Sequence, residues 1–421
     1  MNRIFSYGYV MFLYLYDCCQ MFKIHMNMTF CGHKKHDLKE EIMIRIGKIT
    51  LDGHDNYGNK LQNFALQAFL ERYAAHVDTL WHSSLNIFDL DMAKWPLARR
   101  VRLACLESKF EKRIDHWMHE AIRKYRFKQF DDQHIHTRYD CGNILRSDIA
   151  REYDFFLTGS DQVWNPHEQQ EDKRVNFLTF APSEKRIAYA ASFGVSEIPE
   201  KIKKDFSTWI EGMTAISVRE QRGAEIVREL TGREVPVLVD PAMLLSAEEW
   251  NKIAKKPIWF TNEKYILLYF LSGIPEVAQC NIERLGRERN LKIIDLMDEG
   301  KIDWYCSDPV EFLYLISHAE LIYTDSFHGA VFSILYHRPF VICDRQEKHT
   351  EKRANSRIDT LLDLFQLPDR YGIKSNQYMV ETPFEMDFTG VEKILERERK
   401  RSDHFIRSAM GLPLNEVPDR R

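Results

Sequence analysis

The feature that most constrains this chain is a regular alternation, beginning at Met43, of short apolar segments with longer segments of helical spacing. The first apolar segment is IRIGKITL at 44–51, and the segment 60–73 that follows it places apolar residues on one side of a helix. Strands that alternate with helices form parallel sheets, because each crossover between parallel strands places a helix over one face of the sheet. The sequence therefore predicts an α/β fold built from doubly wound, Rossmann-like sheets.

The alternation runs to residue 343 in two cycles that separate near residue 245. The predicted strands after the first are 153–159, 186–194, 215–220, 235–240, 265–271, 292–296, 321–323 and 339–343. The predicted helices after the first are 200–213, 223–230, 275–290, 309–319 and 391–410. Pro241 lacks a backbone donor, so the first sheet is expected to stop there. Two cycles predict two lobes with a cleft between their sheet edges.

The length of 421 residues exceeds the size at which a single hydrophobic core stops growing, which also favours two lobes. The predicted domains are an N-terminal lobe at 43–243 with a helical insertion at about 89–130, a C-terminal lobe at 244–388, and a C-terminal helix and tail at 389–421. Residues 1–42 contain the apolar run IFSYGYVMFLYLY, which is too short to span a bilayer. We expect residues 1–42 to be an upstream extension outside the fold, with a weak membrane anchor as the alternative.

Composition and missing motifs exclude several classes of function. The formal net charge of −4, without a long run of lysine and arginine, argues against nucleic-acid binding. The eight cysteines include no C-x-x-C pair, so neither a zinc site nor a disulfide framework is predicted, and we interpret them as reduced thiols of a cytoplasmic protein. The sequence also lacks glycine-rich nucleotide fingerprints and spaced histidine–glutamate metal motifs. We therefore predict no metal and no bound nucleotide cofactor.

Polar residues follow the predicted strands at four places, where the carboxyl edges of parallel strands form ligand-binding crevices. In DNYGNKLQ, Asn59 stands at a helix start whose free amides favour an anion, and Gly58 permits close backbone approach; ordinary capping by an asparagine is the alternative. In TGSDQVWNP, Ser160 and Asp161 follow a buried strand. Asp161 can orient a sugar hydroxyl or accept its proton, unless these residues only form a turn. Trp164 can offer a platform to a sugar ring, although an aromatic residue at such a position is more often part of the core.

The other two loops carry a cation and a histidine. Arg219 ends the strand AISVRE, and its planar guanidinium suits bidentate contact with phosphate or carboxylate; a structural ion pair with Glu220 or another acid is the alternative. In TDSFHGAVFSILYHRPF, the residues Ser326, His328 and Gly329 lie where a strand turns into a helix. The positive end of a helix favours an anion, and a histidine beside that anion can carry a proton. A capped or surface histidine is the alternative.

Six blocks in this order, DNYGNKLQNFALQ, GSDQVWNP, YAASFG, SVRE, DPAMLL and TDSFHGAVFSILYHRPF, resemble the polysaccharide pyruvyl transferase family over about residues 44–365. Members of that family are similar to two-lobed GT-B glycosyltransferases. They transfer the pyruvyl group of phosphoenolpyruvate to sugar hydroxyls, forming a ketal on a cell-surface glycan or its precursor. The resemblance implies a cytoplasmic enzyme without a cofactor, with phosphoenolpyruvate as donor substrate and a sugar or lipid-linked oligosaccharide as acceptor. It also allows peripheral contact with the inner membrane through that acceptor.

The resemblance further implies roles for particular residues. His328 is the implied general acid or phosphoenolpyruvate contact, and Arg219 is an implied ligand of the donor's phosphate or carboxylate. We assign Asp161 to catalysis, as the carboxylate that helps the attacking sugar hydroxyl. The predicted substrate-binding residues, with Arg219, are Asn59, Ser160, Ser326, Gly329 and Arg357.

One position departs from the family pattern. Many relatives carry an arginine two positions before the histidine, where this chain has Ser326. Arg353 or Arg357 is a candidate replacement for that anion contact, or the donor is bound differently. Two other functions stay open at this level: a GT-B glycosyltransferase that uses a nucleotide sugar, and a catalytically inactive glycan-binding relative.

Overall fold

The computed structural model of the chain describes residues 43–51, 55–73, 75–81, 111–139, 143–167, 172–345, 356–374, 377–378 and 380–414. The expected extension at 1–42 lies outside the described residues, as do 89–110 of the expected insertion and the candidate Arg353. All elements below belong to one compact unit, Ile44–Arg421. Within the described residues no helix combines the length and the apolar character needed to cross a membrane.

The first lobe is built on a six-stranded sheet with the order β3-β2-β1-β4-β5-β6, in which all strands are parallel. Its strands are β1 (Ile44–Ile49), β2 (Ala75–Leu80), β3 (Thr137–Arg138), β4 (Phe155–Thr158), β5 (Arg186–Ala191) and β6 (Ala215–Val218). This is the strand order of a Rossmann sheet, and the chain reverses its direction of travel across the sheet between β1 and β4. Loops after these two strands therefore meet at a switch point where ligands bind in α/β proteins.

The second lobe is built on another six-stranded sheet, with the order β12-β11-β10-β9-β7-β8. Its strands are β7 (Tyr265–Tyr269), β8 (Lys292–Asp295), β9 (Leu321–Thr324), β10 (Phe340–Cys343), β11 (Tyr371–Lys374) and β12 (Gln377–Tyr378). They are parallel except for the antiparallel pair β11 and β12. The switch point of this doubly wound sheet lies between β7 and β9. The predicted fold class, an α/β chain with two Rossmann-like, doubly wound lobes, is confirmed.

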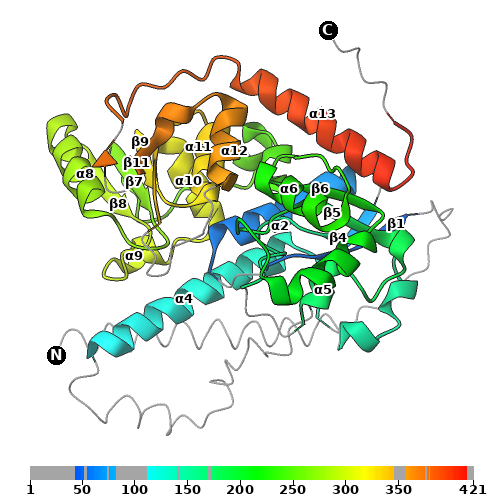
Figure 1. Ribbon diagram of the computed structural model, residues 1–421. Coiled ribbons are helices and arrows are strands. Elements are labelled where there is room, and N and C mark those ends of the chain that lie inside the picture. The colour runs from blue at the N-terminus through cyan, green and yellow to red at the C-terminus, as the bar shows by residue number, and fades with distance from the viewer. Residues whose placement is uncertain are drawn as a thin grey trace, which may run out of the picture. The chain divides into compact units, whose positions relative to one another are not determined.

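Helices join the strands as right-handed crossovers require. They are α2 (Tyr57–Leu70), α4 (Glu111–His134), α5 (Glu200–Glu211), α6 (Gln221–Thr231), α7 (Ala247–Asn251), α8 (Glu276–Arg289), α9 (Ile302–Tyr305), α10 (Pro309–His318), α11 (Phe327–Leu335), α12 (Ser356–Phe365) and α13 (Val391–Ala409) (Figure 1).

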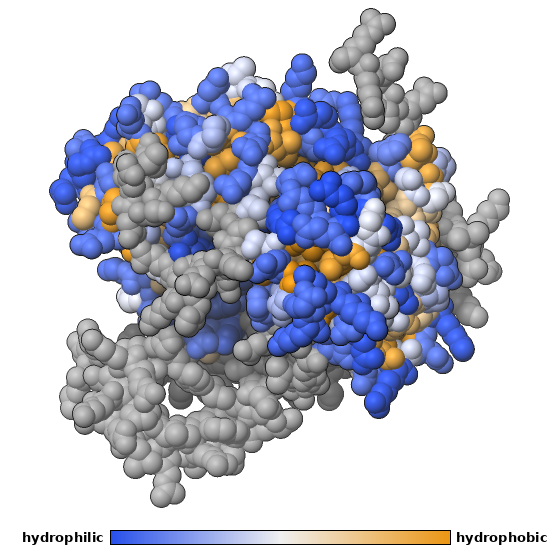
Figure 2. Space-filling view, in the orientation of Figure 1, coloured by the Kyte–Doolittle hydropathy of each residue, from blue (hydrophilic) through white to orange (hydrophobic). Residues whose placement is uncertain are grey.

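On the face shown in Figure 2, hydrophilic side chains predominate and apolar ones form scattered groups.

Successive residues of a strand point to opposite faces of the sheet. In both sheets, neighbouring strand residues enter apolar clusters on opposite faces, so both faces are buried. Leu267 and Leu268 of β7 enter different apolar clusters, as do Ile187 and Ala188 of β5. One of these clusters receives residues from both sheets, and Tyr57 at the start of α2 lies within it. The two lobes therefore share a continuous apolar core instead of meeting through a polar interface.

Two helices make polar contacts across the lobes. Arg123 of α4 is fully buried and donates to the hydroxyl of Tyr57 at 3.1 Å and to the carbonyl oxygen of Tyr305. In α13, the hydroxyl of Ser402 accepts from Tyr189 of β5 at 3.0 Å. The predicted C-terminal helix thus packs on the first lobe after the chain has completed the second (Figure 1).

One predicted strand is wrong and strands β2, β3, β11 and β12 were not predicted, whereas the domain boundaries stay predictions. Segment 235–240 is not a strand: it forms a single bridge from Val237 to Val218, and a 3₁₀ turn begins at Pro241. Pro236 has no N–H to donate, which leaves too few ladder bonds for a strand. Strand β2, with the sequence AHVDTL, was not predicted, although its residues alternate between fully and partly buried.

Candidate active site

The predicted polar loops of the first lobe meet at the switch point between β1 and β4. Asn59 lies in the first turn of α2, which follows β1, and Asp161 follows β4. The Asn59 side-chain amide donates to Asp161 Oδ2 at 2.6 Å, so the two loops are joined directly. Asn56 caps the helix by accepting from the backbone N–H of Asn59 at 3.2 Å. Capping, the alternative interpretation of this loop, is therefore present, and Asn59 has a second contact beyond it.

The loop after β4 needs glycine at its first position. Gly159 has a φ of +115°, and a Cβ there would lie 2.2 Å from the carbonyl oxygen of Tyr189. Asp161 follows with a φ of 59°, in the left-handed region that aspartate enters more readily than most residues. This backbone path turns the Asp161 carboxylate back over the ends of the strands.

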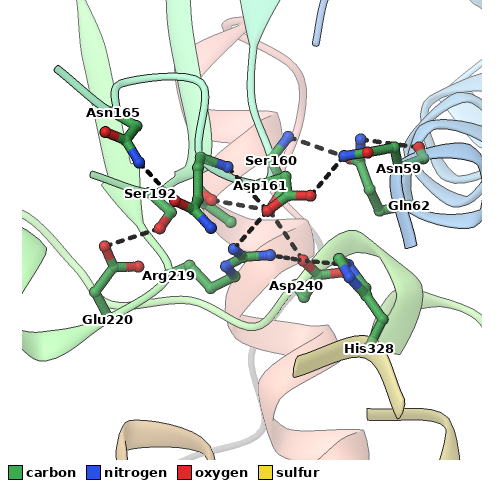
Figure 3. Close-up of polar contacts among 12 residues, drawn as sticks. Asn59, Gln62, Ser160, Asp161, Asn165, Ser192, Arg219, Glu220, Asp240 and His328 are labelled. Carbon is green, nitrogen blue, oxygen red and sulfur yellow. Dashed lines mark hydrogen bonds and ion pairs between the residues drawn. The ribbon is translucent and has the colours of Figure 1, made fainter. Parts of the chain in front are cut away.

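Arg219 is the centre of the site. Its Nη2 donates to Asp161 Oδ1 at 3.0 Å and its Nη1 donates to Asp240 Oδ2 at 2.7 Å (Figure 3). The guanidinium also lies over the ring of Phe327, 4.3 Å from the centroid, and its side chain is only 1% exposed. The structural ion pair left open by the sequence is thus present, with two aspartates as partners instead of Glu220.

Asp240, the first residue of the block DPAMLL, belongs to the cluster although the sequence analysis does not predict it as a site residue. Its carboxylate accepts from Arg219, from the hydroxyl of Ser160 at 3.0 Å and from the backbone N–H of Ala242 at 2.9 Å. The sequence does contain a signal for this residue, because an aspartate directly after an apolar run is expected to be buried. A buried carboxylate must be paired, so such an aspartate indicates a nearby cation. Ser160, predicted to bind substrate, is fully buried, and its hydroxyl donates to Asp240; the substrate-binding role stays a prediction.

The charges of this cluster shift the pKa values of both aspartates. Burial works to raise the pKa of Asp240, but His328 and Arg219 outweigh it and hold the pKa well below its usual range. For Asp161 burial again acts upward, and attraction to Arg219, then to His328 and Arg357, lowers the pKa. Both carboxylates are therefore ionised at neutral pH, and both are weak bases in this state.

His328 joins the cluster from the second lobe, at the start of α11. Its Nε2 lies 3.5 Å from Asp240 Oδ2, without the alignment of a hydrogen bond, and has no other acceptor among the described residues (Figure 3). The ring packs against Gly58, where a Cβ would lie 2.0 Å from His328 Nδ1. The close approach expected at Gly58 is thus made by the imidazole, whose side chain is 6% exposed.

Ser326 and Gly329 have structural roles at the same helix start. Ser326 is the N-cap of α11, and its hydroxyl accepts from the backbone N–H of Gly329 at 3.4 Å. A Cβ on Gly329 would lie 2.4 Å from Thr324 Oγ1. Asp325, which precedes Ser326, joins the ends of β9 and β7 at the second switch point. Its carboxylate accepts from the backbone N–H groups of Leu271 and Ser272 at 2.7 and 3.0 Å.

Trp164 lies in the core, which was the alternative for this residue. It is 1% exposed, stacks on Phe177 with ring centroids 5.1 Å apart, and donates from Nε1 to the carbonyl oxygen of Asn176 at 3.2 Å. It is therefore not available as a platform for a sugar. In the described part of the chain, no group of three or more histidine, cysteine, aspartate or glutamate side chains is arranged to hold a metal.

A pocket of about 370 Å³ opens beside Arg219 and is bounded by both lobes and by α13. Its polar lining includes Arg219, Asp240 and Arg357, and its apolar lining includes Phe327 and Leu361. Neither His328 nor Asp161 lines this pocket. Five of the predicted residues thus meet in one cluster with Asp240: Asn59, Ser160, Asp161, Arg219 and His328. Of this cluster, only Arg219 and Asp240 line the pocket, and Arg357 lines it beside them.

Arg357 of α12 lines the pocket without a carboxylate partner among the described residues. Among the described residues it forms no ion pair with a carboxylate; the Gln162 amide oxygen, turned toward it, accepts from Nη1 at 2.8 Å and from Nη2 at 3.3 Å. Burial, followed by the like charges of Arg219 and Arg345, lowers the pKa of Arg357 to about 10. A cation in such a position gains stability when an anion binds beside it.

The sequence profile of the polysaccharide pyruvyl transferase family matches residues 56–347, which include all the cluster residues from Asn59 to His328. The chain therefore belongs to this family, and it is a transferase. Searching curated proteins gave no match.

Solved structures with a similar arrangement of elements include enzymes of other families. The UDP-N-acetylglucosamine 2-epimerase from Rickettsia bellii has a TM-score of 0.46 and 9% identity, covering 88% of this chain and 97% of that chain. MnaA from S. aureus with UDP has a TM-score of 0.46 and 12% identity, covering 90% and 100%. The glycosyltransferase SnogD from Streptomyces nogalater has a TM-score of 0.39 and 11% identity, covering 88% and 98%.

The contact between Gly58 and His328 predicts a specific energetic coupling. We expect Gly58→Ala to lower the free energy of unfolding by roughly 2 kcal/mol, because the new methyl group overlaps the imidazole. In a His328→Ala background the same change should cost much less, since the ring has been removed. Chemical denaturation of the two single variants and the double variant measures the coupling; strictly additive effects would contradict the contact.

The ion pairs of Arg219 predict a pH-dependent loss of stability. Arg219→Gln leaves two buried carboxylates without their cation, which should cost roughly 3–5 kcal/mol at neutral pH. Asp161 and Asp240 have folded pKa values below their unfolded values of about 4. Their stabilisation is therefore present above that pH and is lost as pH falls through the folded pKa. In the variant the two pKa values rise, so protonation relieves the unpaired charges.

We expect the difference in Tm between wild type and Arg219→Gln to be largest at neutral pH and to shrink as pH falls toward about 4. Differential scanning fluorimetry over that range is the measurement. Arg174→Gln is the matched control, because Arg174 pairs with Asp172 at the surface and should change Tm little. A Tm difference that is constant with pH would refute the charge assignment.

Proposed function

We propose that the protein transfers the pyruvyl group of phosphoenolpyruvate to hydroxyls of a sugar in a cell-surface polysaccharide or its precursor, forming a pyruvate ketal. The observation that carries this proposal is the pair of guanidinium groups, Arg219 and Arg357, lining one pocket between the lobes of a family member. Phosphoenolpyruvate carries a phosphate and a carboxylate, and planar guanidinium groups suit both.

The donor would bind at the inner end of this pocket. The Nε atoms of Arg219 and Arg357 are buried and have no hydrogen-bond acceptor among the described residues. Leaving such a donor unpaired costs free energy, and an anion oxygen would satisfy it. Arg219 would keep its ion pairs with the two aspartates and add one hydrogen bond from Nε to the anion. Arg357 pairs with no carboxylate among the described residues, so its charge would be balanced by the anion. Arg357 thus takes the place that an arginine at position 326 would fill in relatives.

The reaction adds a proton to the methylene carbon of the donor and generates positive charge at C2. A sugar hydroxyl then forms a bond to C2 and loses its proton; a second hydroxyl displaces phosphate and closes the ketal. We assign the proton donor to His328, whose Nε2 has no hydrogen-bond acceptor among the described residues. Asp161 is ionised and already accepts from Arg219 and Asn59, so we propose that it orients the attacking hydroxyl, whose proton leaves with the phosphate. Because the His328 ring faces Asp240 and does not line the pocket, we propose that the ring turns toward the bound donor before it gives up its proton.

The acceptor is proposed from the family alone. A sugar or a lipid-linked oligosaccharide would approach from the outer part of the pocket, where Gln221 and Thr360 supply polar groups and Leu361 and Leu364 supply apolar surface. We propose that the enzyme works in the cytoplasm, where such precursors and phosphoenolpyruvate are both present. No resident cofactor enters this scheme.

Incubation with ¹³C-labelled phosphoenolpyruvate and a candidate acceptor tests the function directly. We expect release of phosphate together with a new ketal signal in the ¹³C NMR spectrum of the glycan. His328→Ala should lose this transfer while keeping its thermal stabilisation by phosphoenolpyruvate, because it removes the acid and not the anion contacts. Stabilisation by nucleotide sugars alone would reject the proposal in favour of a glycosyltransferase, and unchanged transfer by His328→Ala would reject the acid.

Arg357 offers a separate test of donor binding. Arg357→Gln should raise KM for phosphoenolpyruvate roughly tenfold or more, because one charge-assisted contact to the anion is lost. Its Tm should change little, since the residue has no carboxylate partner among those described. Steady-state kinetics with varied donor measures the effect, and Arg228→Gln on the exposed side of α6 is the control. A KM equal to that of the control would remove Arg357 from the donor site.

A further inference from the structure

A second pocket, of about 560 Å³, lies in the second lobe where α10 and α11 end, just before β9 and β10 begin. It is therefore at the amino edge of the second sheet. His328 is at the carboxyl edge, at the other end of α11, roughly 12 Å from Tyr336 along the helix axis. None of the described residues that line this pocket also lines the pocket beside Arg219, so the two are separate.

Arg338 lines this second pocket with a charge that no carboxylate of the described chain matches. Its side chain forms no ion pair and no hydrogen bond with a described residue, and its Nε is buried without an acceptor. Glu392 is the one acid among the described lining residues, and it lies 3.3 Å from Nε2 of His337. Glu320, just before β9, pairs with Lys264 at 3.2 Å. A bound anion would supply the missing partner of Arg338.

The hydroxyl of Tyr336 is another buried donor in the wall of this pocket. It has no hydrogen-bond partner among the described residues, and burial raises the pKa of Tyr336, so the hydroxyl keeps its proton at neutral pH. Leaving buried donors unpaired costs free energy. Tyr336 and Arg338 together therefore favour a ligand that brings oxygen acceptors.

Aromatic rings and short side chains form much of the remaining wall. The rings of Tyr314 and His318 stack with centroids 4.0 Å apart and planes 16° apart, and His318 Nδ1 lies 2.9 Å from the carbonyl oxygen of Tyr314. Ala247, Ala254 and Leu335 complete the wall with small or apolar groups. Such a surface favours a flat ligand, because aromatic groups gain energy by stacking on one another.

We propose that this pocket binds a small aromatic anion, a flat ring that carries a carboxylate or a phosphate group. The planar guanidinium of Arg338 would contact the anionic group, and the Tyr336 hydroxyl would donate to it. The ring of the ligand would lie against Tyr314 and His318. The volume of about 560 Å³ is in the range of roughly 300–1,000 Å³ that small-molecule pockets occupy. The inference does not rest on the proposed transfer reaction.

Isothermal titration calorimetry of the full-length chain tests this site, with benzoate as the carboxylate probe and phenyl phosphate as the phosphate probe. We expect at least one of these anions to bind roughly tenfold or more tightly than benzamide, which has the ring without the charge. Arg338→Gln should weaken binding of that anion to the level of benzamide, because the charge-assisted contact is lost. The tighter of the two probes identifies the anionic group that the pocket prefers.

Arg287→Gln is the matched control, because Arg287 is exposed on α8, 3.8 Å from Glu283, and its loss should leave binding unchanged. Ala254→Phe keeps Arg338 but narrows the pocket, and it should cause loss of binding. The Tm of Arg338→Gln should match that of the wild type, which separates binding from folding. Absence of wild-type binding to both anions would overturn the proposal. Binding that survives both Arg338→Gln and Ala254→Phe would do the same, since the probe would then occupy another part of the chain.

Discussion

The buried guanidinium of Arg219 is the interaction on which the site depends. It ties Asp161, after β4, to Asp240, the N-cap of the 3₁₀ turn that begins at Pro241, and its flat face rests on Phe327 of the second lobe. A buried carboxylate is tolerated only when it is paired, so each aspartate needs this one cation. His328 approaches Asp240 from the other lobe, so the cluster contains side chains from both lobes.

Helix α2 connects the apolar core shared by the two lobes to the polar cluster. Tyr57 belongs to the apolar cluster that both sheets feed, and two residues further along the same helix Asn59 belongs to the polar cluster. Helix α2 therefore places one side of its first turn in the core and another at the switch point. With α11 beginning next to Gly58, the carboxyl edges of the two sheets are brought together by packing, and the charged groups meet there as a consequence.

The departure at position 326 has a local physical cause. Serine is among the best N-cap residues, and Ser326 satisfies an amide at the start of α11 that an arginine side chain would leave open. Arg357, which lies on α12 of the same lobe and has a lowered pKa, lines the pocket together with Arg219.

The α/β class, the two cycles of strands and the loops that carry polar groups could be predicted from the residue pattern, because period and strand-end chemistry are local properties. Helix α13 and strands such as β7 follow from this pattern. Which polar residues meet could not be predicted, because Asp240, the Asn59–Asp161 contact and the inward turn of His328 depend on residues far apart in the chain. The failed strand at 235–240 has the same origin, since whether an apolar run joins a sheet depends on its neighbours as much as on its own residues.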